Sequence, residues 1–181
     1  VFLGPTASGK TTLAIEIARQ QNGAVISADS RQVYAEFNIG TAKPQDAWQD
    51  TPHEVTKADA VDSVPHYLIN IASPTAKYTL SQWQSAADLL IQQLLDQSKQ
   101  PLIVGGTMLY IDSLLYRFSI PEVAPDETLR HKLEKKTTDE LYRDLLNQDP
   151  AARDFIELHN RRRTIRALEV IKATGKKFSE L

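Results

Sequence analysis

A phosphate-binding motif begins four residues into the chain. Residues 4–11, GPTASGKT, match the G-x-x-x-x-G-K-[ST] pattern of a P-loop. Its glycines let backbone N–H groups turn inward around phosphate oxygens, Lys10 supplies a mobile positive charge, and the Thr11 hydroxyl can ligate Mg²⁺. The motif needs a buried strand before it and a helix behind it, whose dipole favours an anion. The alternative is a glycine-rich turn without a ligand, but this does not explain why the motif lies between a strand signal and a helix signal.

Strand and helix signals alternate over residues 1–120. Short apolar runs predict buried strands, and helical periodicity or a capping box predicts helices. We expect strands at 1–3, 24–27, 67–71 and 101–104, and helices at 11–20, 79–95 and 109–116. This order predicts an α/β fold with a P-loop NTPase-like parallel sheet flanked by helices. Residues 45–65 are polar and without clear periodicity, so we expect a surface excursion there.

The strand signal stops after Pro121. Residues 126–136, 139–148 and 161–173 all predict polar helices, and Gly175 suits the end of the last one. The sequence therefore predicts two domains: a P-loop core domain at 1–120 and an all-helical subdomain at 121–181, packed beside the sheet domain or inserted into it.

Composition excludes several classes of protein. The chain has no cysteine, hence no disulfide or thiolate metal site, and no apolar run long enough to span a bilayer. There is no secretory signal, so we expect a cytoplasmic protein without a membrane partner. The net charge of −2 is unlike that of a protein that coats nucleic acid, yet residues 157–181 are locally basic.

Asp29 follows the apolar run that ends at Ala28. Ligands of an open parallel sheet lie at the carboxyl ends of its strands, so we expect Asp29 near the phosphate loop. It could hold Mg²⁺ through water or take a proton from a nucleophile. It could equally cap a turn.

Three further features have ordinary structural interpretations beside functional ones. Gly105-Gly106-Thr107 also follows a strand, and a simple turn is favoured there over a close backbone approach. Arg161, Arg162, Arg163 and Arg166 lie on a predicted helix and suit a polyphosphate or a nucleic-acid backbone, although such runs are usually solvated surface. His66 is interpreted as structural.

Two functions of different kinds are compatible with these residues. One is a small-molecule kinase with Arg163 and Arg166 as lid arginines. The other is a group transferase whose arginines contact a nucleic-acid backbone. A GTP-dependent switch is disfavoured, because the Asn-Lys-x-Asp motif that reads guanine is missing.

Six segments in order resemble the tRNA dimethylallyltransferases: GPTASGKTTLA, SADSRQVY, IGTAKP, PHYLI, LIVGGTMLY and RRTIRALEV. The resemblance covers essentially the whole chain. It implies a nucleotide-kinase-like fold whose P-loop holds the pyrophosphate of dimethylallyl diphosphate. It further implies Mg²⁺ as cofactor and transfer of the prenyl group to the exocyclic amine of an adenine beside the anticodon. The target base would have to be flipped out of its stack.

The resemblance also implies residue roles. Asp29 would be the base, with Thr6 and Arg163 as further catalytic residues, and Thr11 would ligate the metal. The diphosphate-binding residues would be Gly4, Pro5, Thr6, Ala7, Ser8, Gly9, Lys10 and Thr11. The tRNA-binding residues, which contact the anticodon stem-loop, would be Asp29, Ser30, Arg31, Gln32, Thr107, Arg130, Arg162, Arg163, Thr164, Ile165 and Arg166.

The sequence also departs from the family pattern. The stretch between IGTAKP and PHYLI is longer than expected, and Leu158-His159-Asn160 stands where His-Pro-Asn is usual. Family members continue well beyond the position of Leu181, so we expect a fragment of a longer, monomeric protein. The runner-up is an adenylate isopentenyltransferase, which prenylates a free nucleotide and needs no RNA clamp.

Overall fold

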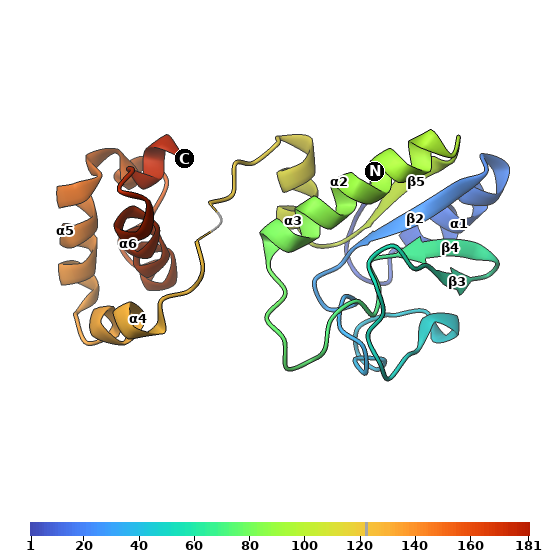
Figure 1. The fold of residues 1–181 in the computed structure, drawn as a ribbon, viewed down its shortest axis with the longest axis horizontal. Coiled ribbons are helices and arrows are strands. Elements are labelled where there is room, and N and C mark those ends of the chain that lie inside the picture. The colour runs from blue at the N-terminus through green and yellow to red at the C-terminus, as the bar shows by residue number, and fades with distance from the viewer. Residues whose placement is uncertain (122) are drawn as a thin grey trace. The chain divides into compact units, whose positions relative to one another are not determined.

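A five-stranded, mostly parallel sheet organises the first part of the chain (Figure 1). The computed structural model describes residues 1–121 and 123–181 and divides into two compact units, Val1–Phe118 and Ser119–Leu181. The strands of the first unit are β1 (Phe2–Leu3), β2 (Gly23–Ala28), β3 (Asp59–Val61), β4 (Val64–Tyr67) and β5 (Gln100–Gly105). Their order is β1-β5-β2-β4-β3. Neighbours pair in parallel except β3, which is antiparallel to β4 at the edge.

Helices cover both faces of this sheet because successive strand residues point to opposite sides. Val25 and Leu102 pack with α1 (Lys10–Gln20) in one apolar cluster. Ile26 and Ile103 pack with α2 (Leu80–Asp96) and α3 (Met108–Leu115) in the other. The mixed α/β fold with a mostly parallel sheet is the one that the sequence predicts.

The start of α2 shows how local sequence fixes an element. The Thr79 side chain accepts from the Gln82 backbone N–H, and the Gln82 side chain accepts from the Thr79 N–H, which completes the predicted capping box. Within the helix, Trp83 is fully buried, and its Nε1 donates to the Ser27 carbonyl at 3.0 Å. This bond ties α2 to the end of β2.

The predicted strand at 67–71 is wrong in position. The strand lies earlier, at Val64–Tyr67, because Leu68 and Asn70 adopt left-handed backbone conformations that end it. The apolar run is still buried at Leu68 and Ile69. Its backbone pairs with residues 32–33 instead, for example through the Ile71 N–H and the Val33 carbonyl at 2.8 Å.

The interpretation of residues 45–65 as a surface excursion is only partly right, because most of the segment is exposed but it also contains regular structure. The segment contains a short 3₁₀ helix, η1 (Gln45–Ala47), and the hairpin of β3 with β4. Ala47, Asp59 and Val61 are buried. Sequence periodicity misses this because polar side chains, rather than an apolar stripe, fasten much of the segment.

The second unit is entirely helical in its regular structure, among the residues described. It contains α4 (Glu127–Glu134), α5 (Thr138–Gln148), α6 (Arg161–Thr174) and two 3₁₀ helices, η2 (Pro150–Asp154) and η3 (Phe178–Glu180). The bounds of the three α-helices lie close to those predicted. Leu133, Leu141, Leu145, Ile156 and Leu168 form its core. Gly175 ends α6 with a φ of 69°, as its sequence position predicts.

Candidate phosphate-binding site

The loop between β1 and α1 turns sharply toward the helix start. Ala7 and Gly9 have left-handed backbone conformations, with φ of 63° and 79°. A Cβ atom added at Gly9 would have no other atom within 4 Å, so there is room for a side chain. Glycine is favoured at this position because of its positive φ angle. Lys10 begins α1, and its Nζ donates to the Pro5 carbonyl at 2.8 Å. The lysine amine therefore lies within the loop.

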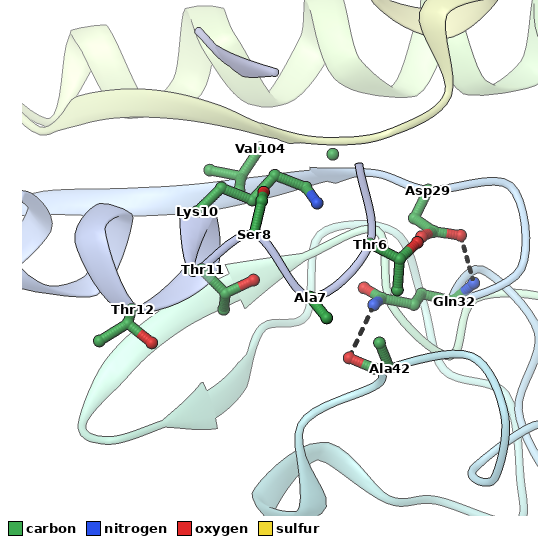
Figure 2. A pocket seen from close by; sticks show the side chains of 12 residues that line it. Thr6, Ala7, Ser8, Lys10, Thr11, Thr12, Asp29, Gln32, Ala42 and Val104 are labelled. Atoms are coloured by element: carbon green, nitrogen blue, oxygen red, sulfur yellow. Dashed lines mark hydrogen bonds between the residues drawn. The ribbon is translucent and has the colours of Figure 1, made fainter. Parts of the chain in front are cut away.

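A cavity of about 330 Å³ adjoins this loop. Figure 2 shows its wall: residues 6–12 on one side, with Asp29, Gln32 and Ala42 contributed by other segments. Val104 and Gly105 from the end of β5 complete the lining. Of the residues predicted to bind diphosphate, those from Thr6 to Thr11 line the cavity, and Gly4 and Pro5 do not. The volume is that of an ordinary small-molecule site.

Asp29 both caps a turn and faces the cavity. Its Oδ1 accepts from the backbone N–H groups of Arg31 at 2.8 Å and Gln32 at 3.4 Å. Its Oδ2 makes no hydrogen bond within the described part of the chain. The capping and the functional interpretations of Asp29 are thus compatible, because the turn uses one carboxylate oxygen and leaves the other without a hydrogen bond in the described residues.

Thr107, which directly precedes α3, binds the same turn. Its Oγ1 accepts from the Ser30 backbone N–H at 3.0 Å, and its own N–H donates to the Ala28 carbonyl at 3.1 Å. Thr107 lies far from Asp29 and Ser30 in sequence, yet the three residues form one cluster at the carboxyl ends of β2 and β5. Arg31 is exposed beside it.

Gly105 allows this close approach of the two strand ends. A Cβ atom at this position would lie 2.1 Å from the Ala28 carbonyl oxygen and 2.4 Å from its carbon. No side chain can occupy that space, so the interpretation of the glycine pair as a simple turn is wrong for Gly105. At Gly106 a Cβ would lie 3.3 Å from the Gly4 carbonyl, which is tight but less severe.

Gln32 connects the turn to the segment that contains Ala42. Its Oε1 accepts from Ser27 Oγ at 3.0 Å, and its Nε2 donates to the carbonyls of Thr41 and Ala42 at 3.2 and 3.1 Å. The Gln32 side chain therefore fixes the position of the segment with Ala42, which forms one side of the cavity wall (Figure 2).

A buried polar network supports that segment, and sequence reasoning missed it. Lys43 is only 4% exposed, and its Nζ donates to the Tyr34 carbonyl at 2.7 Å and to Asn70 Oδ1 at 2.6 Å. Asn70 in turn donates to Asp59 Oδ2 at 2.9 Å, which also contacts His53 Nε2 at 3.1 Å. Burial lowers the pKa of Lys43, while the nearby Asp59 opposes that effect. The sequence signal was the IGTAKP segment, but nothing local shows that its lysine is buried.

His66 is buried, as its structural interpretation implies. It is 2% exposed, and its Nδ1 lies 3.0 Å from the Val64 carbonyl oxygen. Burial lowers the pKa of His66, although the Val64 carbonyl and nearby Asp59 and Asp62 act in the opposite direction.

In the second unit, two of the predicted RNA-contacting arginines share one carboxylate. Glu169 is 1% exposed, and its Oε1 accepts from Arg130 Nε at 2.9 Å and from the Asp126 backbone N–H at 2.6 Å. Its Oε2 accepts from Arg130 Nη2 at 3.0 Å and Arg166 Nη1 at 2.6 Å. Burial alone would raise the pKa of Glu169, but the hydrogen bonds from the arginines hold it below its usual value.

The other predicted RNA-contacting residues of α6 divide by exposure. Arg162 and Arg163 are exposed in its first turn, whereas Arg161 Nη2 donates to the Glu134 carbonyl at 2.6 Å. Thr164 and Ile165 are 1% and 9% exposed, so their side chains belong to the core of the unit rather than to an open surface. The predicted catalytic Arg163 belongs to this second unit, and the cavity belongs to the first.

Hard oxygen donors in the cavity suit a magnesium ion. Thr11 and Asp29 both line it. Within the described residues there is no group of three or more His, Cys, Asp or Glu side chains that could hold a metal by itself. A cation here would therefore draw most of its ligands from bound phosphate oxygens and water, as Mg²⁺ commonly does.

The fold and the site define a P-loop-type α/β protein with an acidic residue facing its phosphate loop. The sequence model of the family described as IPP transferase matches residues 32–181, and one described as isopentenyl transferase matches residues 1–54. The chain belongs to the IPP transferase family.

Its relatives carry related descriptions. It is 45% identical over 179 residues to the tRNA dimethylallyltransferase of Gloeothece citriformis, covering 99% of this chain and 55% of that protein. The corresponding protein of Dehalococcoides mccartyi is 40% identical, with 100% and 53% covered. The chain thus spans about half the length of these curated relatives.

Solved structures agree in fold. The full-length tRNA isopentenylpyrophosphate transferase of Bacillus halodurans matches with a TM-score of 0.57 and 38% identity, over 97% of this chain and 55% of that one. A eukaryotic dimethylallyltransferase described as acting on tRNA matches with a TM-score of 0.76 and 29% identity, over 99% and 42%.

Proposed function

We propose that this chain is part of a tRNA dimethylallyltransferase. The enzyme transfers the dimethylallyl group of dimethylallyl diphosphate to the exocyclic N6 amine of the adenine 3′ of the anticodon and releases diphosphate. The observation that carries the proposal is that the phosphate loop and Asp29 line one and the same cavity. A diphosphate leaving group and a base must both reach the same reacting centre, and this cavity provides for each.

The loop binds the leaving group. Backbone N–H groups of residues 6–11, the α1 N-terminus and Lys10 neutralise negative charge that grows on the diphosphate as the allylic carbon–oxygen bond breaks. Lys10 Nζ carries three protons, so it can contact a phosphate and keep its bond to the Pro5 carbonyl. The bonding electrons leave with the diphosphate, and the allylic carbon becomes electrophilic.

Asp29 serves the nucleophile. The adenine amine attacks the allylic carbon, a carbon–nitrogen bond forms, and Asp29 Oδ2 accepts the proton that the amine loses. Oδ1 stays bonded to the Arg31 and Gln32 N–H groups, so the carboxylate keeps its orientation during transfer. Thr6, which lines the cavity from the loop, faces the reacting groups.

Magnesium is the cofactor of this proposal, held by the Thr11 hydroxyl. When bound, Mg²⁺ would neutralise part of the diphosphate charge and so favour departure of the leaving group. Thr11 lies in the first turn of α1, so the cation that its oxygen would hold and the helix dipole would both neutralise the same diphosphate.

The anticodon stem-loop of tRNA is the proposed partner. The exposed Arg162 and Arg163 supply cationic contacts for phosphates, and Asp29 to Gln32 with Thr107 lie beside the cavity where a flipped adenine would enter. We propose that the enzyme acts as a monomer in the cytoplasm. Among the residues described, no helix is long and apolar enough to cross a membrane.

The test is a prenylation assay on the full-length protein. It is incubated with Mg²⁺, dimethylallyl diphosphate and unmodified tRNA, and the mass of digested nucleosides is measured. A gain of one prenyl group on adenosine is the expected result. Prenylation of free AMP or ADP in place of tRNA would move the assignment to an adenylate isopentenyltransferase. Consumption of ATP with a small metabolite, and no prenylation, would assign the P-loop to a kinase.

A further inference from the structure

The Nε2 atom of His66 has no hydrogen-bond partner among the described residues. Its Nδ1 lies 3.0 Å from the Val64 carbonyl oxygen, which can only accept, so Nδ1 carries the proton of the neutral ring. Nε2 must then be an acceptor. It is buried and has no hydrogen bond within the described residues. A buried acceptor without a donor is costly, so a donor is expected.

A second cavity, of about 20 Å³, lies where that donor is needed. Its polar lining consists of Thr11, Ser27, Gln32 and His66. Thr11, Gln32 and Val104 also line the larger phosphate-loop cavity, so the small cavity lies directly behind it. Strand register explains the position of His66. In the pairing of β2 with β4, His66 lies opposite Val25, and both side chains line the small cavity on the side of the sheet that α1 covers. About 10–15 Å³ is enough for one water molecule.

The side chains of Ser27 and Gln32, which also line the small cavity, already donate to other acceptors. Ser27 Oγ donates to Gln32 Oε1, and Gln32 Nε2 donates to the Thr41 and Ala42 carbonyls. The Thr11 hydroxyl has no hydrogen bond assigned to it within the described residues. One water can therefore satisfy two groups, by donating to His66 Nε2 and accepting from Thr11 Oγ1.

We propose that His66 is a positioning residue for the magnesium ligand Thr11, acting through one buried water molecule that joins His66 Nε2 to Thr11 Oγ1. Drawing the Thr11 proton inward leaves the lone pairs of its oxygen directed to the phosphate-loop cavity, where a cation takes one of them. Because the role of Thr11 as a ligand belongs to the proposed function, this inference rests on that function.

Calorimetric binding of inorganic diphosphate to the full-length protein tests the inference without catalysis. Binding is measured with and without Mg²⁺ for the unmodified protein, His66→Leu and His66→Gln. Loss of a residue that orients a metal ligand typically weakens metal affinity about 10–100-fold. His66→Leu should therefore weaken Mg²⁺-dependent binding about tenfold and leave metal-free binding unchanged. His66→Gln, which can still accept from the water, should recover most of the loss.

Thr11→Val supplies the matched background, because valine keeps the shape of threonine and removes the hydroxyl. In that background His66→Leu should have no further effect on Mg²⁺-dependent binding. Additive losses, or equal losses with and without Mg²⁺, would overturn the inference while the proposed function stands. Diphosphate binding that does not depend on Mg²⁺ even in the unmodified protein would overturn the inference together with the proposed magnesium cofactor, whereas the prenylation assay tests the transfer reaction separately.

A crystal structure of the unmodified full-length protein at about 1.5 Å gives a second measurement that does not depend on any variant folding. An ordered water within hydrogen-bond distance of both His66 Nε2 and Thr11 Oγ1, roughly 2.7–3.2 Å, is expected. A direct bond from another side chain to Nε2, or a dry cavity, would overturn the inference.

Discussion

Only one oxygen of Asp29 is bonded to the turn, and this allows the proposed role of its charge to be tested separately from the turn. In Asp29→Asn, the amide oxygen can still accept from the Arg31 and Gln32 N–H groups, but the side chain can no longer take a proton. We expect tRNA binding to stay nearly intact and the transfer rate to fall by roughly 10²–10⁴. Single-turnover prenylation and a binding titration measure the two quantities. Full activity of the variant would show that Asp29 is not the base.

In the proposed function, Lys10 binds the diphosphate. Since its amine lies within the loop, Lys10→Ala should weaken diphosphate binding far more than tRNA binding. The two affinities are measured on the same preparation. Arg19→Ala removes a cation farther along α1 and is the control; it should change neither. Equal losses of both affinities in Lys10→Ala would contradict this division of roles.

At the scale of elements, the contact between the ends of β2 and β5 depends on one missing side chain. Gly105→Ala places a Cβ against the Ala28 carbonyl, and because both partners are backbone the strands must separate. We expect a loss of stability of about 1–3 kcal/mol or more, measured by chemical denaturation. Gly106→Ala is the matched control, and its clash with the Gly4 carbonyl is milder. A smaller effect at 105 than at 106 would contradict the geometry.

The junction of α4 with α6 has a pH dependence of defined sign. Because the arginines hold the pKa of Glu169 below its usual value, its ionised form stabilises the unit above about pH 4.3, the ordinary pKa of glutamate. That stabilisation is lost as the pH falls through the lowered folded-state pKa. We expect the protection factors of α6 amides, which correct exchange rates for the intrinsic effect of pH, to fall in this acidic range. Glu169→Gln should lower these protection factors already at pH 7 and remove their acid dependence; an unchanged acid profile would contradict the assignment.

At the scale of the whole molecule, the uneven charge predicts how tRNA affinity depends on salt. Arg163 is exposed in the first turn of α6, and each phosphate contact that is lost should flatten the logarithmic salt dependence by roughly 0.7–0.9. Arg163→Ala should show this change. Lys172→Ala removes an exposed cation from the other end of the same helix and should not. An unchanged salt dependence together with unchanged tRNA affinity would show that these arginines are ordinary solvated surface residues.

The sequence by itself determined what short-range chemistry fixes. The spacing of Gly4, Gly9 and Lys10 specifies a strand–loop–helix unit. The capping box at Thr79 starts a helix, and Gly175 ends one through its backbone freedom. Apolar runs of strand length predicted the α/β sheet. Each of these signals acts over a few residues, so each can be read without knowing the fold.

Only the tertiary structure decided which distant residues meet. Lys43 meets Asn70, Gly105 meets Ala28, and Glu169 meets Arg130, and in each case the partners are distant in sequence. Periodicity does not encode such contacts, because a buried polar group is specified by its partner rather than by its position in a repeat. The same holds for the cavity behind Thr11. The local sequence supplied a phosphate loop, and the packing of β2, β4 and β5 placed an acidic residue and a buried histidine around it.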